Sequence, residues 1–161
     1  MARVSSTPVT RALDDAAIPY TLHLHDRPVT SLEQAASERG LRPGQIVRSL
    51  VFRSEDGSFL IVLAPGPRQV SWPKLRRHLE VSRLTTASPE EVLQVTGYQP
   101  GAVSPLGLAA PVRILADRSL TEEQTVSIGA GVRNAGIVLQ TEDLLRLVQP
   151  EIGDFMEGAN L

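Results

Sequence analysis

The sequence contains no cysteine, and this absence limits its chemistry. Without thiols the 161-residue chain can form no disulfide, has no thiol nucleophile and offers no thiolate to a metal. Long apolar runs are also missing. The longest, FLIVLA at residues 59–64, is far too short to cross a bilayer, and the first ten residues lack the apolar core of a signal peptide. We therefore expect a cytoplasmic protein that does not bind membranes.

Neither sign of charge dominates, because 16 basic residues oppose 18 acidic ones and the net charge is −2. A general electrostatic attraction to nucleic acid is thereby excluded, although a local basic face could still supply one. Such a cluster lies within residues 68–83 and comprises Arg68, Lys74, Arg76, Arg77 and Arg83. It could contact several phosphates if its members share a face; the alternative is a solvated helix face.

Repeats, low-complexity tracts and linker-like segments are absent as well. Apolar residues make up 42% and charged residues 21%, which is the usual balance of a folded globular chain. The length suits one domain, residues 1–161, with residues 150–161 as a short irregular C-terminal appendage.

Periodicity and capping residues predict alternating helices and strands. Thr30 with Glu33 and Ser88 with Glu91 each predict a capping box, and Asp56-Gly57 between two apolar runs predicts a hairpin. The unbroken second run indicates a strand covered on both faces, near the centre of the sheet. The predicted helices span 8–17, 30–40, 71–80, 88–97 and 141–148, and the predicted strands span 18–25, 50–54, 59–64, 111–117, 125–129 and 137–139. This order favours a mixed α/β fold around one sheet or barrel.

Two glycine-rich loops could bring backbone groups close to a ligand. The first contains Gly97, Gly101, Pro105 and Gly107 between a predicted helix and a predicted strand, where an ordinary connection is the alternative. The second, GAGVRNAG at residues 129–136, has neither Walker nor dinucleotide-binding spacing, and a hairpin turn is its alternative.

Side chains that could carry chemistry are few. His23 and His25 can share a strand face, but no third ligand accompanies them, so we expect no metal site. Ser49, Ser104 and Ser127 are potential nucleophiles, yet none lies in a Gly-x-Ser-x-Gly turn, which argues against a serine-hydrolase triad.

Arg48 interrupts an apolar run, GQIVRSLVF at residues 44–52. If the run is a strand, this cation lies on the same face as Ile46, Leu50 and Phe52 and requires an anion, carbonyl acceptors or a wet pocket. If residues 43–48 instead form a short helix, the cation lies near the free carbonyls of its last turn.

Five segments together resemble the YbaK and prolyl-tRNA-synthetase-associated editing domains, which remove wrong amino acids from tRNA. They are GQIVRSLVF, LIVLAPGPRQV, ASPEEVLQVTGYQPGAVSPLG, PVRILAD and GAGVRNAGIVLQTEDLLRLV, in the family's order and spacing. The stretch TGYQPGAVSPLG matches a Gly-Tyr-x-x-Gly-x-x-x-Pro-x-Gly loop of the family. The resemblance implies a mixed sheet curled into a barrel-like core with helices around it.

The resemblance also implies a pocket for an aminoacyl group and the terminal adenosine of tRNA. Arg48, Gly101 and Gly129 would then be catalytic, and three basic residues of the predicted helix 71–80, Lys74, Arg76 and Arg77, would contact tRNA. The substrate-binding positions would be His25, Ser49, Gly97, Ser104, Pro105, Gly107, Ala130 and Gly131. No cofactor is implied; the partners are mischarged tRNA and prolyl-tRNA synthetase.

The chain departs from the family at four positions. Arg48 replaces a common lysine and cannot act as a general base. Gly129 and Gly136 replace a serine and an acidic residue of the cysteinyl-tRNA deacylases, and His25 replaces a tyrosine. An aminoacyl ester is already activated, so positioning and backbone donors can suffice for hydrolysis.

These features predict a free-standing editing deacylase, acting on an alanine- or cysteine-like amino acid on proline tRNA. A family member that binds aminoacyl-tRNA or a nucleotide without turnover is the alternative.

Overall fold

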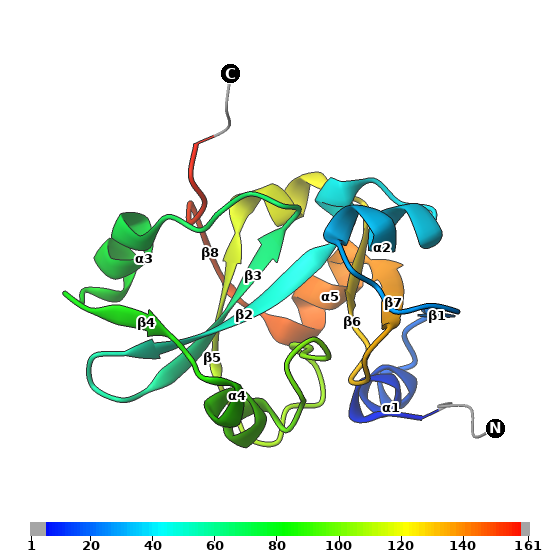
Figure 1. Cartoon of the computed structure of the whole chain (residues 1–161), viewed down its shortest axis with the longest axis horizontal. Helices are drawn as coiled ribbons and strands as arrows, with labels where there is room; N and C mark the ends of the chain where they lie inside the picture. The colour runs from blue at the N-terminus through cyan, green and yellow to red at the C-terminus, as the bar shows by residue number, and fades with distance from the viewer. Residues whose placement is uncertain (1–5, 159–161) are drawn as a thin grey trace.

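The computed structural model describes residues 6–158, in which helices and strands alternate (Figure 1). The helices are α1 (Pro8–Asp15), α2 (Leu32–Glu38), α3 (Trp72–Leu79), α4 (Pro89–Thr96) and α5 (Thr141–Val148), with 3-10 turns η1 (Pro43–Gln45) and η2 (Arg118–Glu122). The strands are β1 (Thr21–Leu24), β2 (Val47–Ser54), β3 (Phe59–Pro65), β4 (Leu84–Thr86), β5 (Arg113–Asp117), β6 (Thr125–Gly129), β7 (Ala135–Gln140) and β8 (Glu151–Gly153). The mixed α/β class is confirmed, and β4 and β8 are strands that the sequence patterns did not indicate.

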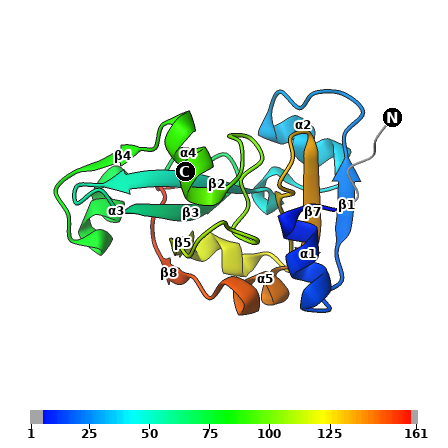
Figure 2. The same ribbon diagram turned by 90° about the horizontal axis from the view of Figure 1, so that it is seen from below.

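The strands form two sheets. One has the order β4-β2-β3-β5-β8 and is parallel at its β3–β5 and β5–β8 pairs; the other is antiparallel, with the order β1-β7-β6. Their strands run in different directions (Figure 2). A parallel bridge between Ile46 and Ser127 joins the sheets at the start of β2. Beyond it the loop at 100–103 lies between β2 and β6, with the carbonyl of Val103 against Gly129. Neither sheet closes, so the expected barrel-like core is wrong.

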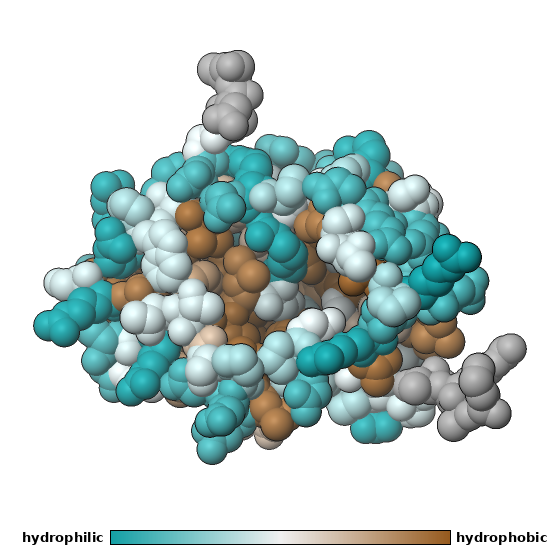
Figure 3. Space-filling view, in the orientation of Figure 1, coloured by the Kyte–Doolittle hydropathy of each residue, from teal (hydrophilic) through white to brown (hydrophobic). Residues whose placement is uncertain are grey.

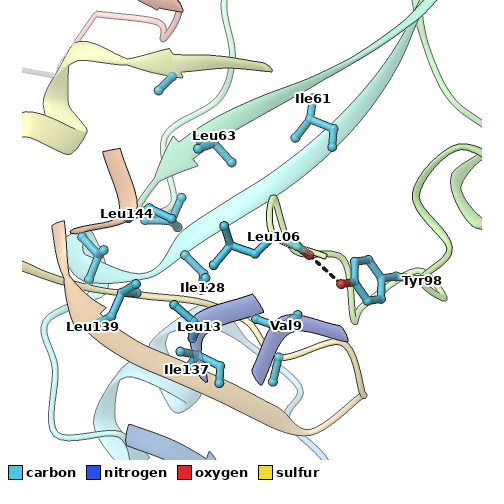
Figure 4. Close-up of a cluster of buried hydrophobic side chains, with 14 of the residues drawn as sticks. Val9, Leu13, Ile61, Leu63, Tyr98, Leu106, Ile128, Ile137, Leu139 and Leu144 are labelled. Carbon is cyan, nitrogen blue, oxygen red and sulfur yellow. Dashed lines mark hydrogen bonds between the residues drawn. The ribbon is translucent and has the colours of Figure 1, made fainter. Parts of the chain in front are cut away.

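The core has two parts, one between the two sheets and one on the opposite face of the five-stranded sheet. Side chains of β3 alternate. Ile61 and Leu63 pack with α1, β6 and β7 (Figure 4). Leu60 and Val62 pack with α3 and the end of the chain. β3 is thus covered on both faces and occupies the middle of the five-stranded sheet, as its unbroken apolar run predicted.

Helix boundaries follow the predicted caps with one exception. Ser88 and Glu91 form the predicted capping box of α4, which ends at Gly97 in the left-handed conformation. In α2 the N-cap is Ser31, whose hydroxyl accepts from the Gln34 N–H at 3.0 Å, so the predicted Thr30–Glu33 box is wrong. Thr30 and Ser31 are adjacent and both carry a hydroxyl group, so either could be the N-cap. The backbone conformation at the start of the helix decides which of them takes this position.

The end of the chain is part of the fold up to Met156. β8 pairs with β5, and Phe155 and Met156 are buried in the core under α3. The buried carboxylate of Asp117 accepts a hydrogen bond from the Phe155 N–H at 2.9 Å. The expectation of an irregular appendage from residue 150 is therefore wrong, because short apolar pairs such as Phe155-Met156 show no periodicity in a sequence.

Within residues 6–158, no helix combines the length and the apolar character needed to cross a membrane.

Candidate functional site

A cleft follows the open edge of β2, where the two sheets separate. Two cavities of about 370 Å³ and 290 Å³ adjoin there and share Arg48, Ser49, Leu50, Gly101 and Val103. The larger continues over apolar side chains, and in the space-filling view such side chains gather in a hollow across the middle of this face (Figure 3). The apolar lining of the larger cavity includes Leu50, Phe52, Val70, Trp72 and Val92. The cleft therefore has two arms, the 370 Å³ cavity and the 290 Å³ cavity, which meet at Arg48 and Gly101.

Arg48 lies in strand β2, so the first of its two predicted placements is correct and the short helix over residues 43–48 is not. Its Nε donates to the Gly66 carbonyl at 2.7 Å and its Nη2 donates to the Arg68 carbonyl. Burial lowers the pKa of the guanidinium. Carbonyl acceptors in the turn after β3 thus hold the cation at the cleft, and three of its five N–H groups remain for a ligand.

Ser49 presents unpaired polar groups to the cleft. The Gly66 N–H donates to the Ile46 carbonyl, which fixes the hydrogen-bonding pattern between β2 and β3. The even-numbered residues of β2 therefore form backbone hydrogen bonds with β3, and the odd-numbered residues direct their N–H and C=O groups to the opposite edge of the strand. On that edge the Val51 carbonyl is taken by Ala87, whereas Ser49 is not paired by β4 or β6. Its Oγ is buried and, among the described residues, has no hydrogen-bond partner. A ligand in the cleft can pair with the backbone groups, whereas the Oγ has no exposed surface through which a ligand could reach it.

Gly101 and Gly129 form the opposite wall. Gly101 has φ +88° and lines both cavities, which suits a residue without a side chain. A Cβ on Gly129 would lie 1.9 Å from the Val103 carbonyl oxygen, so glycine allows the loop to approach β6 this closely. The two predicted glycines thus meet Arg48 and Ser49 in one place.

Arg39 is a lining residue that the sequence patterns did not indicate. From the end of α2 its guanidinium donates to Ser127 Oγ at 2.8 Å and to His25 Nε2 at 3.0 Å. A Cβ on Gly136 would lie 2.3 Å from its Cζ, so the absence of a side chain at 136 makes room for this arginine. A basic residue before a helix-ending glycine is typical of helix capping, which concealed its position in the cleft.

His25 lies behind Arg39 rather than in the cleft. Its side chain is fully buried, and its Nδ1 contacts Glu38 Oε1 at 2.8 Å. Because Nε2 accepts from Arg39, Nδ1 carries the proton. His23 stacks edge-on against His25, with ring centroids 4.7 Å apart. No group of three metal-ligating side chains occurs in the described part of the chain.

Six further residues predicted to bind substrate, besides His25, lie outside the lining of the cleft and shape the loops behind it. Gly97 ends α4, and Gly107 packs against Pro8. Ser104 is fully buried, and its hydroxyl accepts from the Leu106 N–H. Pro105, Ala130 and Gly131 likewise pack within the loops.

The basic helix α3 begins beside the cleft at Trp72. Its Lys74 donates to Asp154 and to the Met156 carbonyl, which anchors the end of the chain. Arg76 and Arg77 form none of the ion pairs found within residues 6–158.

Tyr98 braces the glycine loop from within the core. Its hydroxyl donates to the Leu106 carbonyl at 2.5 Å, and the Gly107 carbonyl lies at 3.0 Å (Figure 4). Burial raises the pKa of Tyr98 to about 12. We expect Tyr98→Phe to lower the free energy of unfolding by about 1–2 kcal/mol, because it leaves a buried carbonyl unpaired.

The pKa of Tyr98 adds a pH signature to this prediction. A tyrosine titrates near pH 10 in an unfolded chain, so between about pH 10 and 12 the unfolded state loses its proton first and the wild type loses stability. Urea unfolding at pH 8 and 11 should show the Tyr98→Phe deficit shrinking at the higher pH. Tyr20→Phe, at an exposed hydrogen bond to Asp14, is the control and should cost at most about 0.5 kcal/mol. Equal effects of the two variants would contradict the bracing role.

The cleft supplies positioning rather than acid–base groups. Among the described residues that line its two cavities there is no aspartate, glutamate or histidine. Cations and backbone groups at Arg48, Ser49 and Gly101 can orient a carbonyl and stabilise negative charge on its oxygen.

Comparison with known proteins follows this geometry. A model of the aminoacyl-tRNA editing domain matches residues 26–147. The chain is 31% identical over 121 residues to proline–tRNA ligase of Bacillus licheniformis, covering 75% of this chain but only 21% of the ligase. It is 30% identical over 131 residues to the multifunctional Ser/Thr-tRNA deacylase ProXp-y of Escherichia coli K12, covering 78% of each. A solved structure described as a proposed trans-editing enzyme for prolyl-tRNA synthetase has a TM-score of 0.87 and 28% identity, covering 98% of this chain and all of the other.

Fold and cleft together define an α/β domain with a cleft between two sheets, beside a glycine loop. The chain belongs to the aminoacyl-tRNA editing domain family, as its sequence resemblance indicated.

Proposed function

We propose that this protein hydrolyses the ester between a small amino acid and the 3′ end of a mischarged tRNA. The observation that carries the proposal is the unpaired edge of β2 at Ser49, which faces Gly101 beside Arg48 in a cleft without acid–base side chains. A relative whose name is Ser/Thr-tRNA deacylase supports the reaction class.

The chemistry asks little of the side chains. An aminoacyl ester is activated, so hydrolysis needs a fixed carbonyl, a water and donors for the developing oxyanion. Arg48 is always charged and already held by two carbonyls, so it serves as an orienting donor and not as a base. Backbone groups at Ser49 and Gly101 complete the polar contacts that the cleft offers.

The substrate is a small amino acid in this proposal. We take alanine and cysteine on proline tRNA as the first candidates, and serine and threonine as the second because the E. coli relative is named for them. The ligase relative and the solved structure make proline tRNA the first tRNA to test, and prolyl-tRNA synthetase the enzyme whose errors this protein would correct.

The direct test is loss of the ester. The protein is incubated with alanyl- and cysteinyl-tRNA for proline and with seryl- and threonyl-tRNA, and the remaining aminoacyl-tRNA is measured over time. Deacylation above the spontaneous rate for at least one substrate is expected. Binding without hydrolysis for the whole panel would overturn the proposal in favour of a non-catalytic binding protein.

Arg48 variants test the proposed geometry. Arg48→Ala should lower kcat/KM for deacylation at least about tenfold, because a charged donor to the substrate is lost. Arg48→Lys keeps the charge but cannot span both the Gly66 and Arg68 carbonyls. Its kcat/KM for deacylation should therefore lie between those of the wild type and Arg48→Ala. Deacylation rates and melting temperatures measured together separate loss of function from loss of the turn.

Arg53→Ala is the matched control for these variants. Arg53 lies on the same strand but is exposed and pairs with Glu91 away from the cleft. It should leave deacylation unchanged. Equal rates for wild type, Arg48→Ala and Arg48→Lys would remove Arg48 from the site.

A further inference from the structure

A third cavity, of about 210 Å³, extends the 290 Å³ arm of the cleft between α2 and the β6–β7 loop. It is lined by Val29, Arg39, Gly101, Arg133, Asn134 and Ala135. Arg39, Gly101 and Ala135 also line the neighbouring 290 Å³ cavity, so the two spaces adjoin. The polar side chains around this cavity are therefore two arginines and one asparagine.

Neither arginine has a carboxylate partner. Within residues 6–158, no aspartate or glutamate lies within ion-pair distance of Arg39 or Arg133. The acidic neighbour of Arg39, Glu38, is engaged by His25 and by Gln34. Burial lowers the pKa of Arg39, and the nearby charge of Glu38 offsets this desolvation only in part. A half-buried cation of this kind is stabilised by an anion.

Arg39 is oriented by neutral groups. It donates to His25 Nε2, to Ser127 Oγ and, at 3.4 Å, to the Ala135 carbonyl. These contacts use three of its five N–H groups and leave two. The imidazole can accept from Arg39 only while neutral, and Glu38 fixes that tautomer from the other side.

Arg133 and Asn134 add further donors at the other wall. Arg133 uses its Nε on the Pro100 carbonyl at 3.2 Å, which leaves both terminal nitrogens. Asn134 has φ +59°, and its Oδ1 accepts from the Val29 N–H at 3.0 Å. Because its oxygen is used in this way, its amide nitrogen is the group left to donate. The side chains of the cavity wall thus offer donors, and its one side-chain acceptor, Asn134 Oδ1, is already engaged.

We propose that this cavity binds a phosphate group of the nucleotide strand that carries the aminoacyl ester, with Arg39 and Arg133 as its ligands. A phosphate offers the charge and the several acceptor oxygens that two guanidinium groups and an amide match. The assignment to a nucleotide phosphate rests on the proposed function, since the ester would lie in the adjoining cavity. An amino acid ammonium group would be repelled here.

The test compares ligands that differ only in phosphate. Affinities of adenosine, AMP and inorganic phosphate are measured by calorimetric titration at fixed ionic strength, without any ester. AMP should bind at least about tenfold more tightly than adenosine and than inorganic phosphate. Arg39→Gln and Arg133→Gln should each remove most of the AMP advantage while leaving adenosine affinity unchanged.

Two further variants keep the result interpretable. Gly136→Ala should displace the guanidinium of Arg39 without removing its positive charge. It should therefore reduce the ratio of AMP affinity to adenosine affinity. Arg118→Gln, at an exposed arginine in η2, is the control and should change nothing.

The outcomes separate this inference from the proposed function. Equal affinities for AMP and adenosine, or an AMP advantage that survives both arginine variants, would overturn the phosphate site even if deacylation is observed. Inorganic phosphate binding as tightly as AMP would overturn the assignment to a nucleotide. An arginine-dependent AMP advantage without deacylation would uphold the site and reject the hydrolase.

Discussion

Replacement of Gly129 by alanine is expected to lower the free energy of unfolding by about 3 kcal/mol, at the upper end of the range for overpacking. The added Cβ would lie 1.9 Å from the Val103 carbonyl oxygen and 2.8 Å from its carbon. Both are backbone atoms, so no side chain can move aside. The loop at 100–103 must shift, and Gly101 moves with it out of the cleft wall. Deacylation should therefore fall together with stability.

Urea unfolding with an unchanged slope measures this loss. Gly44→Ala is the matched control, because its Cβ would meet only the Glu123 side chain, at 3.8 Å, and it should cost no more than about 1 kcal/mol. A Gly129→Ala protein as stable as the control would show that the loop does not press against β6. Gly129→Ser carries the same Cβ, so restoring the serine of the cysteinyl-tRNA deacylases should impair this chain rather than improve it.

Replacement of Phe155 by alanine should cost about 3–5 kcal/mol of unfolding free energy, the usual range for a buried phenylalanine. The side chain is 1% exposed, and its ring lies edge-on to His78 with centroids 4.9 Å apart. Its loss leaves a cavity beneath α3, next to the parallel strand β8. The melting temperature and urea midpoint measure the effect.

Ile152→Ala is the control in the same segment, because Ile152 is 45% exposed and should contribute about 0.5 kcal/mol or less. A loss of under about 1 kcal/mol for Phe155→Ala would mean that residues 151–156 do not unfold with the sheet. A large loss would establish that chains ending before β8 lack part of their core.

Local sequence signals located most elements because each depends on neighbours along the chain. The Ser88–Glu91 box, the glycine at 97 and the Asp56-Gly57 hairpin act within a few residues, and the structure follows each of them. β3 was recognisable because a strand covered on both faces must be apolar throughout. The prediction of Thr30 as the N-cap of α2 was wrong, because local sequence signals do not show which of two adjacent hydroxyl residues caps the helix.

The candidate site divides in the same way. Arg48, Ser49, Gly101 and Gly129 could be proposed as one site from family resemblance, and the structure brings them to one cleft. Arg39 could not, since its place depends on the space left by Gly136, which lies 97 residues further along the chain. Glycine and proline occur both among the loop residues that line the cleft and among those behind it. Residue type alone therefore could not predict which loop residues line the cleft.

The sequence by itself determined the α/β class, the editing-domain family and the scarcity of catalytic side chains in the site, because residue types and local patterns are fixed in the chain. Only the tertiary structure decided that two open sheets replace a barrel, that residues 151–156 complete the core, and that Arg39 and Arg133 face one cavity without a carboxylate. Each of these depends on contacts between segments far apart in the chain, and such contacts leave no periodic signal in either segment.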